Sequence, residues 1–139
     1  MGAEKNISLN SQVSEHALFT TLVAVVQQAP YEIRGLSNEL HQMKFVSGKT
    51  LMSWGHAFAA TVTGEGAGSV LHLTVTVVPG APKSLMDGRK NQKAAEKFIE
   101  AMNAALAAPN PPRPEPVESF ATIRDGRPVP WTDGDYPGA

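Results

Sequence analysis

Three side chains that can form hydrogen bonds fall at inward positions of the expected strands. Because side chains alternate between the two faces of a strand, His41 is expected on the face of Phe45 and His56 on the face of Phe58. The same alternation, called strand parity below, points Tyr31 inward. Imidazole and phenol groups can hydrogen bond the polar end of a ligand whose remainder is apolar. Their chemistry therefore favours binding of a largely apolar small molecule.

The sequence predicts a ligand-binding site formed by Tyr31, His41, Trp54 and His56. Trp54 and the apolar face of the last expected helix would complete its wall. A structural role is the competing interpretation, because histidines at strand ends are commonly half-exposed or hydrogen-bonded internally. In that case the interior is solid and the four residues bind nothing.

Other chemistries find little support in the sequence. The histidines at positions 16, 41, 56 and 72 include no local pair, and the chain has no cysteine, so we expect no metal site. No nucleophile-elbow sequence occurs. The glycines between Gly64 and Gly68 lack a following Lys-Ser/Thr and suit a hairpin loop better than a phosphate site. We expect no cofactor and no catalytic residue, and an enzyme with an acid or base in a pocket ranks third.

Composition limits the partners and the location of the protein. The 139 residues are 42% hydrophobic and 18% charged, as in ordinary globular proteins. The net charge of -1 argues against nucleic-acid binding, which normally requires an excess of Lys and Arg. Because the sequence shows neither a signal peptide nor a stretch of about 20 apolar residues, we expect a cytoplasmic protein without a transmembrane segment.

Hydrophobic periodicity divides the chain into short strands and two helices. A period of two marks strands near residues 7–9, 31–36, 41–46, 56–63 and 69–78. A helical period follows Ser14 and stops before Pro30, and a second one runs from Ser84 or Asp87 to Leu106. The expected fold is α+β, in the order β-α-β-β-β-β-α, with an antiparallel sheet covered on one face by the long C-terminal helix.

A change of composition at residue 109 predicts the domain organisation. Eight of the eleven prolines lie in residues 109–139, where they favour an extended conformation. We expect residues 1–108 to form one compact domain and residues 109–139 to form an extended or disordered tail. Apolar residues beyond the proline run leave open whether this tail docks on the body or on a partner.

The order of elements between residues 7 and 106 resembles a reduced helix-grip domain, the START or Bet v 1-like architecture. This chain has one helix and two strands fewer than that superfamily. The segments 51–55 (LMSWG) and 85–91 (LMDGRKN) are also similar to recurrent features of small uncharacterised actinobacterial α+β domains, which imply no activity. The helix-grip resemblance implies lipid, polyketide-like or other apolar ligands.

The functional expectation is a small non-catalytic binding domain, with an apolar or lipid-like ligand between the sheet and the C-terminal helix. The alternative is a protein-protein interaction module with a solid core, which uses the outer sheet face or the tail. The sequence leaves the oligomeric state open.

Overall fold

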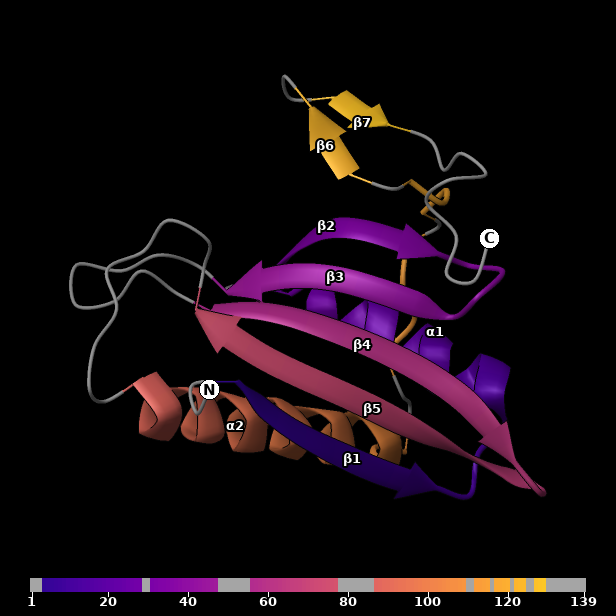
Figure 1. Ribbon diagram of the computed structural model, residues 1–139. Coiled ribbons are helices and arrows are strands. Elements are labelled where there is room, and N and C mark those ends of the chain that lie inside the picture. Colours follow the sequence, from indigo (N-terminus) through magenta and orange to yellow (C-terminus); the bar gives the residue numbers. More distant parts are fainter. Residues whose placement is uncertain are drawn as a thin grey trace.

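One antiparallel sheet of five strands forms the centre of the molecule (Figure 1). The computed structural model describes residues 4–28, 31–47, 56–77, 87–109, 112–115, 117–120, 122–124 and 127–129. The sheet has the order β1-β5-β4-β3-β2 and consists of β1 (Lys5–Ser11), β2 (Tyr31–Ser37), β3 (Gln42–Ser47), β4 (His56–Glu65) and β5 (Gly68–Val77).

Two helices lie together on one face of this sheet (Figure 1). The helix α1 (Glu15–Val26) follows β1, and α2 (Asp87–Ala107) follows β5. The expected α+β order β-α-β-β-β-β-α is therefore confirmed. Within the described part of the chain, neither helix has both the length and the hydrophobicity to span a membrane.

The hairpin of β4 and β5 shows why strand parity could be read from the sequence. Glu65 pairs with Gly68 across a two-residue turn, and Gly66 has a φ of 59°, which glycine adopts at little cost. Beyond the turn, Leu71 and Leu73 are buried under the helices, whereas His72 is exposed on the outer face. Alternation along the strand thus separates a core face from a solvent face.

Local sequence signals also explain the two helices. The Ser14 hydroxyl caps α1 by accepting a hydrogen bond from the backbone N–H of Ala17 at 3.1 Å. In α2, Ala95, Phe98 and Met102 are fully buried at spacings of three and four residues. These residues hold the amphipathic helix against β5 and β1.

Part of the C-terminal segment lies along the outer edge of β2. Phe120 exchanges two backbone hydrogen bonds with Leu36, of 2.8 and 3.0 Å, and its side chain belongs to the hydrophobic core. Asn38 donates a side-chain hydrogen bond of 2.7 Å to the carbonyl oxygen of Val117. A small hairpin of β6 (Thr122–Arg124) and β7 (Arg127–Val129) follows beside β2 (Figure 1). Whether residues 1–108 fold without this segment stays a prediction.

Candidate functional site

Four polar side chains, three from strands and one from α2, form a row across one end of the sheet, on the face that the helices cover. Tyr31 pairs with Ser47 of β3, and His56 of β4 donates its backbone N–H to the Ser47 hydroxyl at 2.8 Å. Asn91 approaches the same row from α2 and bonds His56. We call Tyr31, Ser47, His56 and Asn91 the polar row.

An aromatic cluster of Tyr31, Phe45, Phe58 and Phe98 lies directly next to the polar row. The ring of Tyr31 meets the other three almost at right angles, at centroid distances of 5.8, 5.9 and 5.2 Å. Phe45 and Phe58 are stacked at 4.6 Å with an angle of 3° between their planes. Because all three phenylalanines are buried, side chains pack solidly between the sheet and α2 at this cluster.

The phenol of Tyr31 is half-buried. Burial raises its pKa above the ordinary value, because the neutral phenol loses less hydration than the phenolate. Among the described residues, none forms a hydrogen bond with this hydroxyl. It can therefore donate to, or accept from, a bound molecule.

His56 is held in place by a residue that is completely buried. Its Nδ1 lies 2.7 Å from Oδ1 of Asn91, and in this arrangement the ring N–H donates to the amide oxygen. A neutral imidazole that donates from Nδ1 leaves Nε2 as a hydrogen-bond acceptor. The polar row thus offers a phenol and an imidazole nitrogen beside an apolar wall.

The structure does not bring His41 to this row. His41 directly precedes β3, at the opposite end of the β2–β3 pair from Tyr31 and Ser47. Its φ of 53° places it in the preceding turn, so strand parity does not apply to its side chain. The imidazole hydrogen bonds Glu15 in the first turn of α1 and packs on Phe19 at a centroid distance of 5.0 Å.

Trp54, the fourth predicted residue, lies outside the described residues. The sequence analysis missed Ser47 and Asn91. Asn91 left a usable signal, because it stands four residues before Ala95 and seven before Phe98, on the apolar stripe of α2. A polar residue on such a stripe requires a hydrogen-bond partner, and the structure supplies His56.

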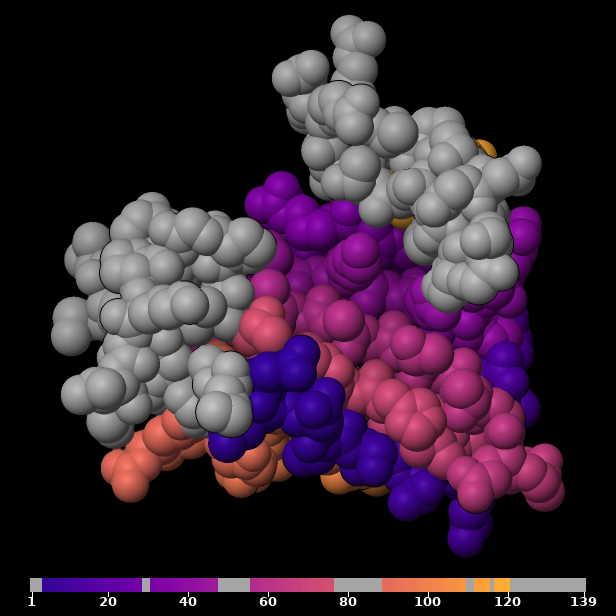
Figure 2. Space-filling model, viewed as in Figure 1, coloured from indigo at the N-terminus to yellow at the C-terminus, as the bar shows by residue number. Residues whose placement is uncertain are grey.

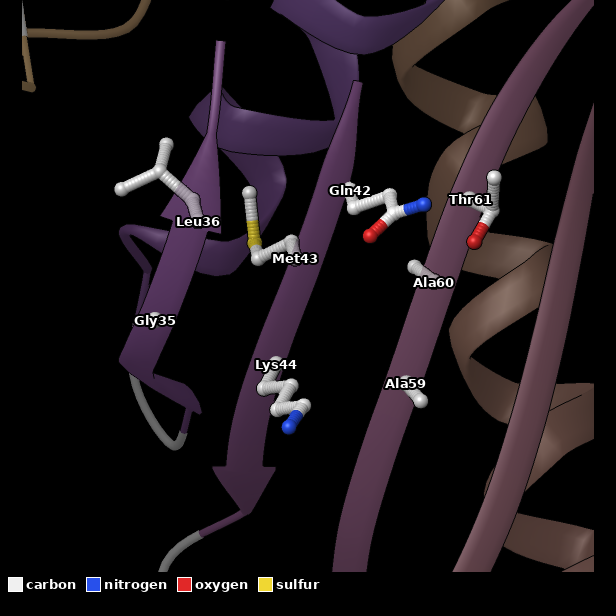
Figure 3. A pocket seen from close by; sticks show the side chains of 8 residues that line it. All are labelled: Gly35, Leu36, Gln42, Met43, Lys44, Ala59, Ala60 and Thr61. Atoms are coloured by element: carbon white, nitrogen blue, oxygen red, sulfur yellow. The ribbon is translucent and has the colours of Figure 1, made fainter. Parts of the chain in front are cut away.

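A separate depression lies on the opposite, outer face of the sheet, which no described helix covers (Figures 2 and 3). It forms because Gly35 and Ala59 have little or no side chain, and Gln42, Lys44 and Thr61 surround it (Figure 3). A volume of about 70 Å³ holds about two water molecules, far less than a drug-sized ligand occupies. This depression is therefore too small for the ligand that the sequence predicts.

Comparison with known proteins identifies the architecture. No family model matches the sequence, and no curated protein matches it. A structural match to an uncharacterised protein from Bacillus thuringiensis has a TM-score of 0.57 at 8% identity and covers 76% of this chain and 99% of that one. The crystal structure of Ara h 8.0201 matches with a TM-score of 0.53 at 11% identity, covering 73% and 94%. The fold is helix-grip-like.

A third match extends this likeness to a protein from a biosynthetic locus. The crystal structure of DynU16, from the dynemicin biosynthetic locus, has a TM-score of 0.56 at 11% identity, with 80% of this chain and 49% of DynU16 covered. The helix-grip-like chain thus spans about half the length of DynU16. Identities this low establish a common fold and nothing about a common ligand.

Proposed function

We propose that this chain is a small non-catalytic binding domain for an apolar ligand with one polar end. The polar end would be hydrogen-bonded by Tyr31 and His56, and the apolar part would lie against the residues next to the polar row. The hydroxyl of Tyr31, which no described residue hydrogen bonds and which lies beside a packed aromatic cluster, is the observation that carries this proposal.

The identity of residue 31 supports a binding role over a purely structural one. Phenylalanine would provide the same ring for packing on Phe45, Phe58 and Phe98, and tyrosine adds a hydroxyl that can hydrogen bond a ligand. His56 is likewise held by Asn91 through Nδ1, which leaves Nε2 available. Both groups lie in the same row across the sheet.

The second candidate is a protein-protein interaction module with a solid core. Dense packing of Phe45, Phe58 and Phe98 favours it, because these side chains fill the space where the fold would otherwise hold a deep cavity. The outer face of the sheet is free of described helices and would provide the binding surface (Figure 2). Ligand binding by the purified protein distinguishes the two candidates.

Native mass spectrometry of the full chain would first detect any copurifying small molecule. A fatty acid with an anthroyloxy fluorophore, which combines a polar carboxyl end with an apolar chain, would then be titrated into wild type, Tyr31→Phe, His56→Ala and Trp54→Ala. We expect saturable binding with one molecule per chain. Loss of one hydrogen bond should weaken it about fivefold in Tyr31→Phe.

His72→Ala is the matched control, since His72 is an exposed strand histidine on the outer face. It should bind the probe as wild type does. If no molecule copurifies and the wild type binds no probe, the ligand-binding proposal fails and the interaction module takes its place. If His72→Ala and His56→Ala weaken binding of the probe equally, the polar row is excluded as the binding site.

A further inference from the structure

The two edges of the sheet differ in how they are protected. At the β2 edge the register shifts between Ile33 and Gly35, Arg34 and Glu32 form an ion pair at 3.2 Å, and Phe120 occupies the backbone groups of Leu36. Bulges, charges and covering segments all prevent an edge strand from pairing with another chain. The β2 edge is therefore blocked.

Among the described residues, the β1 edge has neither a bulge nor a covering segment along its seven residues. Its register with β5 runs without interruption from Lys5 to Ser11, and it contains one charged residue, Lys5, and no proline. Among the described residues, no strand lies on its outer side (Figure 1). Such an edge presents unpaired backbone N–H and C=O groups to a partner.

The pairing pattern identifies which backbone groups of β1 are free. Residues that flank a two-residue turn form a hydrogen-bonded pair, so the backbone groups of Gly68 bond to Glu65 of β4. Successive residues of a strand direct their backbone groups to opposite neighbours, so those of β5 point alternately to β4 and to β1. Val70 and His72 thus face β4, whereas Leu71 and Leu73 face β1. Their partners on β1, Leu9 and Ile7, therefore direct their backbone groups toward β5.

It follows that the free backbone groups of β1 belong to Asn6, Ser8 and Asn10. These three residues are centred on Ser8 in the sequence Asn6-Ile-Ser-Leu-Asn10, which reads almost the same in both directions. We propose that β1 binds the β1 strand of a second copy of this chain, antiparallel and centred on Ser8. In this register Ser8 faces the partner's Ser8, and Asn6 faces the partner's Asn10.

This register satisfies backbone and side chains together. The Ser8 pair and the two pairs of Asn6 with Asn10 join residues whose N–H and C=O groups are free, so each of these pairs can exchange two hydrogen bonds. The exposed Asn6, Ser8 and Asn10 side chains remain on the outer face, while half-buried Ile7 meets the partner's Leu9 on the inner face. Lys5 faces the partner's Ser11, so no like charges oppose each other within the strand. Because a two-fold axis relates the two strands, both copies use the same edge and association ends at the dimer.

Charge substitutions at Asn6 and Asn10 test the register, because both side chains are exposed and the fold should tolerate them. Sedimentation equilibrium of the full chain would compare two double variants. Asn6→Lys with Asn10→Lys opposes like charges twice, and Asn6→Lys with Asn10→Glu opposes opposite charges twice. We expect a dimeric wild type, and a dissociation constant at least about tenfold weaker for the like-charge variant than for its opposite-charge counterpart at low salt.

A proline at position 8 provides a second test. The N–H of Ser8 faces away from β5, so Ser8→Pro removes no hydrogen bond within the monomer but removes both central bonds of the dimer. We expect a monomer with a circular dichroism spectrum like that of the wild type. A monomeric wild type, equal association of the two charge variants, or a folded Ser8→Pro variant that still dimerises would overturn the proposal. If Ser8→Pro unfolds, the charge variants decide.

Discussion

Phe98 is the side chain of α2 that makes the most ring contacts with the sheet. It is fully buried, and its ring lies 5.0 Å from Phe45, 5.2 Å from Tyr31 and 5.9 Å from Phe58. Phe98→Ala should therefore lower the free energy of unfolding by about 3 to 5 kcal/mol, because it removes buried apolar contacts and leaves a cavity. Urea denaturation monitored by circular dichroism measures the change.

Lys93→Ala is the control for this prediction, since Lys93 is exposed on the same helix. Its midpoint of unfolding should remain that of the wild type. Comparable destabilisation by Lys93→Ala and Phe98→Ala would show that α2 presents a different face to the sheet.

The Tyr31 phenol should make stability depend on pH at the alkaline end. Burial raises its pKa in the folded state, so the folded chain holds the phenolic proton more tightly than the unfolded chain does. The resulting stabilisation is fully present below the pKa of an unfolded tyrosine, and is lost as the pH rises through the folded value. Urea denaturation across this range should show a decline that Tyr31→Phe reduces. An equal decline in Tyr31→Phe would contradict the assignment.

Residues in regular strands could be assigned to a face from the sequence, and residues in turns could not. Parity correctly places Phe45 and Phe58 inside, because both lie within uninterrupted strands. His41 also contacts α1 on the covered face, but its positive φ puts it in the turn before β3, at the other end of the strand pair from Tyr31. The pairing of His56 with Asn91 depends on how α2 is placed over the sheet, which no local pattern encodes.

The same distinction holds at the scale of elements. Both helices and the β4–β5 hairpin were predictable, because capping, apolar spacing and turn chemistry all act within a few residues. The strand order β1-β5-β4-β3-β2 could not be predicted in this way, since the place of β1 beside β5 depends on contacts far apart in the chain. That order leaves one edge of the sheet open and brings the other next to the C-terminal segment.

At the scale of the whole molecule, the segment around Phe120 connects the proline-rich region to the body. Its backbone extends the β2 edge by one bridge at Leu36, and its side chain enters the core. Gln27 at the end of α1 adds two hydrogen bonds to the backbone of Glu115, of 2.9 and 2.8 Å. These contacts order an otherwise extended segment, which alone would bury too little apolar surface to fold.

Deletion of residues 109–139 should leave a body that still unfolds cooperatively, because all five strands of the sheet and both helices end before residue 109. The body should be less stable than the full chain, since the deletion exposes the core surface that Phe120 covers. Phe120→Ala in the full chain should reproduce most of the loss, about 3 kcal/mol by urea denaturation, whereas exposed Glu118→Ala should cost little. A truncated chain that fails to fold would move the domain boundary beyond Phe120. A truncated chain as stable as the full one would show that the segment only rests on the β2 edge.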